Sequence, residues 1–204
     1  MKRLALTLLF ACCAIALTAQ EPFHVKYQGD RPTISDFANA LFSAPDDDEE
    51  GEMDESFNAI KYAWTQHRKG LPLDEGTTLT VDQKNGFICY ESRYEKELVR
   101  IEMCYWNESD QKHKLIAYNV SCFSDGKYSA GQFDGLYFYR YDNAKKEMNW
   151  YDAPGFEVEY GTEDGAWVYY DLPRSGKDIT VNYSYDNDKI KKNTLKWDGR
   201  RFSF

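Results

Sequence analysis

The sequence is poor in basic residues, in paired cysteines and in long apolar runs beyond its first twenty positions. Its 204 residues include 34 acidic and 25 basic side chains, so the net charge is −9 at pH 7. An acidic chain without a basic stripe repels phosphate groups, so nucleic acid and anionic membrane surfaces are not expected as partners. No segment after residue 20 is apolar enough to span a membrane, so no transmembrane segment is expected.

Motifs for nucleophilic or metal-dependent catalysis are also missing. Only three histidines occur, they lie far apart in the sequence, and neither GxSxG nor HExxH is present. Three cysteines lie beyond residue 20, and none belongs to a CxxC pair. These absences exclude a disulfide scaffold and a thiol-rich zinc site, and no cofactor is expected.

The chain begins with a pattern typical of a secretory signal peptide at residues 1–19. A positively charged start and an apolar stretch up to Leu17 mark it, and cleavage is expected after Ala19. The alternative is a lipoprotein anchored through Cys12, which the bulky residue two positions earlier and the very short apolar stretch disfavour. The mature protein is therefore expected to be secreted or periplasmic.

Residues 20–70 are expected to form an N-terminal segment with two helices and an acidic linker. The stretch 20–31 has no periodicity and is expected to be a mobile lead-in. Over 33–45 a Thr-x-x-Asp pair can cap a short helix, and a proline ends it. Over 55–70 apolar residues recur at helical spacing, acids precede bases, and a glycine follows.

The acidic run between these helices, DDDEEGEMDE, resembles an EF-hand calcium loop in part. Asp46, Asp48 and Glu50 take positions one, three and five, and a glycine takes position six. Position twelve is Phe57, where the loop needs a bidentate glutamate. A solvated acidic linker is therefore predicted, and a weak calcium site at the three acids is the alternative.

From residue 71 to 204 the pattern changes to short strands separated by turn residues. The predicted strands are 77–82, 87–94, 97–106, 114–123, 135–142, 147–151, 156–160, 166–172, 178–185, 189–197 and 201–204. Strands this close in sequence cannot be parallel without a crossover, so a large antiparallel meander sheet is expected. The predicted fold class is α+β, with the helices packed on a sandwich or partly open barrel as one folding unit.

The register of the predicted strands 87–94 and 97–106 follows from a two-residue turn at 95–96. This turn pairs Tyr94 with Glu97 and sets Glu91 opposite Arg100. Sliding the strands by two residues would place like charges opposite each other, which is unfavourable.

The same register predicts that Cys89 and Cys104 share one sheet face as reduced, packed thiols, and Cys122 is expected to be a core thiol. The stretch MCYWNESDQKHK then contains the end of one strand, with Cys104 and Trp106 on one face. The polar residues 107–113 after it are predicted to form a hairpin loop rather than a metal site.

Aromatic residues make up 16% of the chain and are frequent in the predicted strands. Alternation places Tyr137, Tyr139 and Tyr141 on one strand face, and Trp167 and Tyr169 on a face of another strand. If these faces are exposed, they form flat stacking platforms for a glycan. If the helices or a second sheet layer cover them, they belong to the core.

An enzymatic alternative depends on Glu157 and Glu159, which share one face of the expected strand FEVEY. Two carboxylates about 7 Å apart suit acid–base hydrolysis of glycans or cell-wall material. An exposed polar strand face is the simpler interpretation, because antiparallel sheets with one wet side carry many such residues.

The C-terminal stretch LPRSGKDITVNY through LKWDGRRFSF carries Leu172-Pro173, Gly176-Lys177-Asp178-Ile179 and Trp197-Asp198-Gly199. Over these last thirty-odd residues the chain resembles small secreted proteins of Gram-negative gut bacteria. The resemblance implies export to the cell envelope and a β-rich fold, and it implies no activity. The leading functional expectation is therefore a non-enzymatic binding or scaffolding protein with a glycan or protein partner, and the alternative is the carboxylate-dependent hydrolase.

Overall fold

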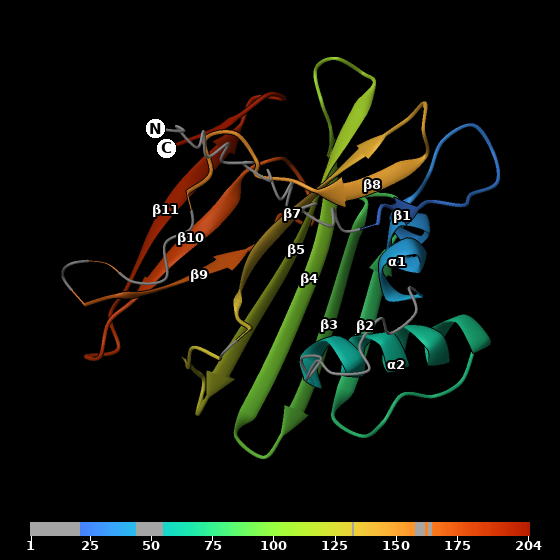
Figure 1. Ribbon diagram of the computed structural model, residues 1–204. Coiled ribbons are helices and arrows are strands. Elements are labelled where there is room, and N and C mark those ends of the chain that lie inside the picture. Colours follow the sequence, from blue (N-terminus) through green and yellow to red (C-terminus); the bar gives the residue numbers. More distant parts are fainter. Residues whose placement is uncertain (1–20, 44–54, 132, 158–161, 163–164) are drawn as a thin grey trace, which may run out of the picture.

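The computed structural model describes residues 21–43, 55–131, 133–157, 162 and 165–204. Two helices, a long curled sheet and a smaller sheet form three layers (Figure 1). The helices are α1 (Ile34–Phe42) and α2 (Glu55–Lys69), and both lie on the same side of the long sheet. Neither has the length and apolar character needed to cross a membrane, within the part of the chain that is described.

The long sheet is eight-stranded and entirely antiparallel, and it curls into a half-barrel. Its strands are β1 (Phe23–His24), β2 (Thr77–Asp82), β3 (Phe87–Tyr94), β4 (Glu97–Asn107), β5 (His113–Ser124), β6 (Lys127–Tyr128), β7 (Gly135–Asp142) and β8 (Glu147–Trp150). Their order is β1-β8-β7-β5-β4-β3-β2, with β6 paired to β5. The prediction of helices packed on an antiparallel meander is confirmed, although the fold is mainly β.

The smaller sheet covers the other face of the long one. It consists of β9 (Trp167–Asp171), β10 (Ile179–Ser184), β11 (Ile190–Trp197) and β12 (Phe202–Ser203), in the order β12-β11-β10-β9. The strand predicted at 156–160 does not begin where expected, because residues 156–157 lie outside any strand. The rest of that stretch lies outside the described residues.

The lead-in to α1 is partly ordered by strand pairing. Phe23 lies opposite Met148 in β8, and the Val25 N–H donates to the carbonyl of Lys146 at 2.9 Å. Val25 is only 2% exposed. The prediction of a mobile lead-in is therefore wrong for residues 23–25, because a two-residue strand is too short to produce a periodicity that a sequence can show.

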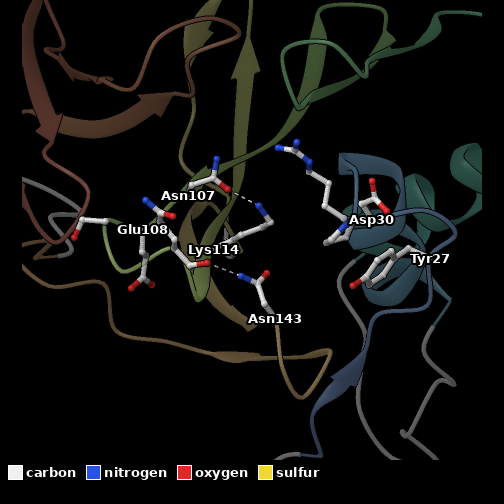
Figure 2. Close-up of a pocket in the computed structure, with 10 residues that line it drawn as sticks. Tyr27, Asp30, Asn107, Glu108, Lys114 and Asn143 are labelled. Carbon is white, nitrogen blue, oxygen red and sulfur yellow. Dashed lines mark hydrogen bonds between the residues drawn. The ribbon is translucent and has the colours of Figure 1, made fainter.

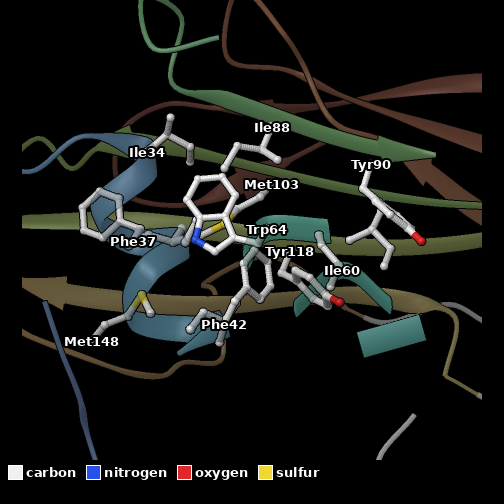
Figure 3. Packing of buried hydrophobic residues seen from close by; sticks show 14 of the residues in the cluster. Ile34, Phe37, Phe42, Ile60, Trp64, Ile88, Tyr90, Met103, Tyr118 and Met148 are labelled. Carbon is white, nitrogen blue, oxygen red and sulfur yellow. The ribbon is translucent and has the colours of Figure 1, made fainter. Parts of the chain in front are cut away.

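The first core lies between the helices and the long sheet (Figure 3). The helix α1 begins with the predicted capping pair, in which the Asp36 carboxylate accepts from the Thr33 N–H and hydroxyl, both at 2.7 Å. Trp64 of α2 donates its indole N–H to Asn39 of α1 at 3.0 Å, and its ring packs edge-on against Phe42. The capped helix thus presents its apolar face to the sheet while one hydrogen bond fixes the second helix beside it.

The predicted register of β3 and β4 is confirmed at every pair, including Glu91 opposite Arg100. The side chains of these two residues nevertheless form hydrogen bonds with other residues. Arg100 donates to Asp171 of β9 at 2.6 Å, and Glu91 accepts from Arg93 at 3.1 Å. Charge therefore agrees with the strand pairing, but the ion pair of Arg100 joins the two sheets rather than the two strands.

The cysteines of the described chain are all free thiols. Cys104 is buried, and Cys89 is half-buried on the same face. Burial raises the pKa of Cys89 to about 12, so this side chain stays a neutral thiol at physiological pH. Cys122 is half-buried, so it is less enclosed than the predicted core thiol.

The second core fills the space between the two sheets. Its aromatic centre is Phe202 of the two-residue strand β12, which is 0% exposed. The Phe202 ring contacts Trp197 at 4.7 Å, Phe138 at 5.4 Å and Trp106 at 5.9 Å between ring centroids. The chain end therefore supplies one of the largest side chains of this core.

A buried polar cluster crosses the same interface. Asn119 of β5 donates to the carbonyl of Tyr170 at 2.9 Å and to the Glu102 carboxylate at 3.2 Å. The N–H of Leu172 donates to the same carboxylate at 3.1 Å. Burial raises the pKa of Glu102 to about 7, so its proton is held far more tightly than in water.

Replacing Phe202 with alanine should lower the free energy of unfolding by about 3–5 kcal/mol, because it empties a fully enclosed ring site. Chemical denaturation of the mature protein measures this change. Phe204→Ala is the matched control, since Phe204 lies two residues later and is 64% exposed. A similar small effect of both substitutions would contradict the placement of β12 in the core.

Glu102 should make stability fall as the pH rises from about 4.5 to about 7. Its folded-state pKa is raised, so the protonated form stabilises the fold fully below the ordinary value of 4.5, and this contribution is lost as the pH passes about 7. Glu102→Gln should remove this decline and raise stability at pH 8 by up to about 3 kcal/mol. Denaturation at several pH values tests it, and Glu75→Gln, at an exposed position, should keep the wild-type profile.

Candidate functional site

A groove of about 500 Å³ lies where β6, the edge strand β9 and the β10–β11 turn meet. Its aromatic lining consists of Tyr128, Trp167, Tyr169 and Tyr185. Its polar and charged lining includes Lys127, Asp186 and Asp188. The groove thus combines ring surfaces with hydrogen-bonding groups, as small-molecule sites commonly do.

A tight turn after β5 builds one wall of the groove. Asp125 and Gly126 adopt left-handed φ values of 51° and 78°, so the chain reverses and β6 pairs back onto β5. This pairing places the Tyr128 ring on Tyr169 of β9, stacked at 4.8 Å with an interplanar angle of 22°. Phe123 packs edge-on against Tyr169 at 5.4 Å between ring centroids.

Trp167 supplies the exposed ring of the groove. It begins β9, lies opposite Ser184 of β10 and is 50% exposed, whereas Tyr169 two residues later is 8% exposed. Both side chains line the groove, as the predicted shared strand face requires. β9 therefore contributes one buried ring, Tyr169, and one half-exposed ring, Trp167, to the groove.

An ion pair between two lining residues joins β6 to the β10–β11 turn. Lys127 of β6 contacts Asp188 of the β10–β11 turn at 2.6 Å, and this hydrogen bond raises the pKa of Lys127. Both side chains are well exposed, so the ion pair orders the two loops more than it stabilises the fold. Burial raises the pKa of Tyr128 and of Tyr169, so both phenols stay neutral at physiological pH.

The three tyrosines of β7 lie away from this groove, on the helix side of the long sheet. Tyr141 is 0% exposed and packs against Phe37 at 5.1 Å, so it belongs to the core. Tyr137 and Tyr139 are half-buried, and both rings contact Trp150 of β8, at 5.6 and 5.7 Å. Of the five aromatic residues singled out from the sequence, two therefore line the groove, two lie on a separate surface beside Trp150, and Tyr141 belongs to the core.

Sequence reasoning missed two aromatic residues of the groove, Tyr128 and Tyr185, and the exposed Trp150. A signal for Tyr128 was present, because the Asp-Gly turn before it can fold a short strand back onto β5. Tyr185 enters the groove only through the packing of the β10–β11 turn beside β6. Local pattern carries no information on such a contact.

The carboxylates of the hydrolase alternative have no paired arrangement in the described residues. Glu157 is exposed, and it lines a cavity of about 250 Å³ together with Arg201 and Phe204. Glu159 lies outside the described residues. The acids of the calcium alternative, Asp46, Asp48 and Glu50, also lie outside them.

Residues 108–112 join β4 to β5, so the predicted hairpin loop 107–113 is one residue shorter at each end. Two residues of this loop and the first residue of β5 form a cluster with metal-ligand chemistry. Single ligand atoms of Glu108, Asp110 and His113 lie within 4.8 Å of one another. Arg140 of β7 already donates to both Glu108 oxygens, at 2.7 and 2.6 Å, and its guanidinium lies 3.1 Å from the His113 ring nitrogen. A metal ion would have to displace this guanidinium, so the cluster is better described as an ion-pair network that braces the loop.

The network also fixes the protonation of Asp110. Burial alone would raise its pKa, but hydrogen bonds from the His113 side chain and from the backbone N–H groups of Lys112 and His113 lower it to about 2. The carboxylate is therefore charged throughout the physiological range and lies 3.6 Å from the Arg140 guanidinium.

Comparisons with known proteins gave no relative: no protein-family model, no curated protein and no solved structure matches the chain. Functional inference therefore depends on the geometry of its own residues.

Arg140→Gln should lower the free energy of unfolding by about 2 kcal/mol, because the largely buried Glu108 carboxylate loses its paired charged hydrogen bonds. Denaturant titration measures the loss. Arg93→Gln is the control, since Arg93 forms an exposed pair with Glu91 and should change stability by less than about 1 kcal/mol. Equal small losses would show that the network does not brace the loop.

Proposed function

We propose that this protein is a non-enzymatic binding protein of the bacterial cell envelope that holds a glycan in the aromatic groove. The observation that carries the proposal is the half-exposed Trp167 ring in a groove lined by three tyrosines. Saccharides have apolar C–H faces that stack on flat rings, and hydroxyl rims that hydrogen-bond to polar groups. A rigid aromatic surface beside neutral phenols and a carboxylate matches both properties.

The groove is preorganised for such a ligand. The Tyr128–Tyr169 stack and the Lys127–Asp188 pair hold the walls together, so little side-chain freedom is lost on binding. Asp186 is exposed at the rim and offers carboxylate oxygens to sugar hydroxyls. The secretory pattern at residues 1–19 supports an envelope or extracellular location, where glycans are abundant.

Binding is better supported than hydrolysis. A glycosidase of the usual type needs two carboxylates on either side of the bond that is cut. The groove contains Asp186 and Asp188, but Asp188 is paired with Lys127, which leaves Asp186 as the second carboxylate without a matching partner among the described lining residues. In the cavity beside Arg201 and Phe204, Glu157 is the one carboxylate among the described lining residues. A protein partner remains the alternative that the following experiment separates.

Trp167→Ala should weaken glycan binding about tenfold or more, because it removes the accessible stacking surface. The mature protein is first screened by thermal shift against cello-, xylo-, manno- and chito-oligosaccharides and soluble peptidoglycan fragments, and positive ligands are titrated by calorimetry. Trp150→Ala is the matched control, because Trp150 is 51% exposed but lies on the other aromatic surface.

Loss of binding in Trp167→Ala with retention in Trp150→Ala supports the groove. The opposite pattern would place the glycan on the surface formed by Trp150, Tyr137 and Tyr139. Absence of any shift across the screen would reject glycan binding and favour a protein partner.

A further inference from the structure

A second cavity, of about 660 Å³, lies at the opposite end of β5 from the groove. It separates residues 27–32 of the N-terminal segment from the loop between β4 and β5. Figure 2 shows Tyr27 and Asp30 on one side and Asn107, Glu108 and Lys114 on the other. None of its lining residues belongs to the aromatic groove, and the two sites are separated by roughly 30 Å of strand.

Lys114 is the central residue of this cavity. It is only 7% exposed, and its ammonium donates to the side-chain oxygen of Asn107, a neutral acceptor. The ammonium also lies 5.3 Å from the centre of the Tyr105 ring. Among the described residues no carboxylate forms an ion pair with Lys114, although an ammonium has three donors and a full charge. A buried charge without a counter-charge is costly, and such charges are normally paired.

A second cation faces the same cavity. Arg31 lines it from the N-terminal segment and forms no ion pair with any described residue. Burial lowers the pKa of Lys114, and the positive charge of Arg31 lowers it further. Two like charges directed at one space repel each other, and an anion between them would relieve this repulsion.

The acids near the cavity do not supply that anion. Glu108 is held by both of its oxygens to Arg140, so its charge is already balanced. Asp30 is exposed at the rim and forms no ion pair with a described residue. The remaining lining, with Asn107, Ser109 and Asn143, is neutral and able to hydrogen-bond.

We propose that this cavity binds a ligand through an anionic oxygen group, a carboxylate, sulfate or phosphate, with Lys114 and Arg31 as its charge partners. The bound anion replaces the missing counter-charge of Lys114, and the neutral polar side chains contact the rest of the ligand. The cavity thus brings together two cations that form no ion pair with a described residue, Lys114 and Arg31, with the exposed carboxylate of Asp30 at the rim. The site is independent of the glycan proposal, because it shares no residue with the groove.

The test titrates phosphate, sulfate and glucuronate separately into the mature protein at low ionic strength, with uncharged glucose as the reference ligand. Amide chemical shifts in NMR spectra report the site and the affinity. At least one anion should bind saturably with shifts confined to residues around the cavity, and glucose should not. The three anions distinguish a carboxylate from a sulfate or phosphate ligand.

Lys114→Gln and Arg31→Gln should each weaken anion binding about tenfold or more, because each removes one charge partner. Lys112→Gln is the matched control: it removes one exposed positive charge from the same loop, outside the cavity, and should change affinity by less than about twofold. Since Arg31 is exposed, its variant keeps the test valid if Lys114→Gln does not fold.

Absence of saturable binding for all three anions would overturn the proposal, as would an equal loss in the Lys112 variant. Trp167→Ala serves as the cross-check. It should leave anion binding unchanged, so failure of the groove and failure of the cavity can be told apart.

Discussion

The long sheet must be covered on both faces, and this constraint organises the molecule. Its central strands β4 and β5 have apolar side chains on both sides, so neither the helices nor the smaller sheet alone could keep them from water. Ile101 and Met103 of β4 pack toward the helices, while Cys104 and Trp106 pack toward the smaller sheet. The two cores are thus joined through single strands, and loss of either cover exposes half of the sheet.

Burial on both faces also explains the polar cluster between the sheets. Once the smaller sheet covers β4 and β5, Glu102 and Asn119 are almost entirely removed from water. They bond instead to backbone groups of Tyr170 and Leu172. Buried hydrogen bonds of this kind contribute less to stability than to fixing one position, because a shifted sheet would leave each group without a partner.

The two proposed sites lie where the layers end. The groove forms where β6 and the turn after β10 extend beyond the sheet interface, and the cavity forms where the N-terminal segment passes the β4–β5 loop. In both places the backbone positions side chains that the core does not need. Trp167 and Lys114 are opposite cases: an apolar ring left exposed and a charge left buried. Each is the residue on which the proposal for its site depends.

The sequence by itself determined the local structure. Turn residues and period-two alternation predicted most strands, the capping pair predicted the start of α1, and opposite charges predicted the β3–β4 register. These features depend on neighbours in the chain or on one short hairpin, so the pattern carries them. The position of Glu108, Asp110 and His113 around the β4–β5 loop followed in the same way.

Only the tertiary structure decided which strand faces are exposed to solvent and which side chains far apart in the sequence contact each other. Arg100 bonds to Asp171, which lies 71 residues later, and the β7 tyrosines are divided between core and surface by the helices that cover them. Phe23 and His24 of the N-terminal segment are held in place by pairing with β8, which lies far along the chain. Contacts of this kind arise from the stacking of layers, whose relative positions leave no periodic trace in the sequence.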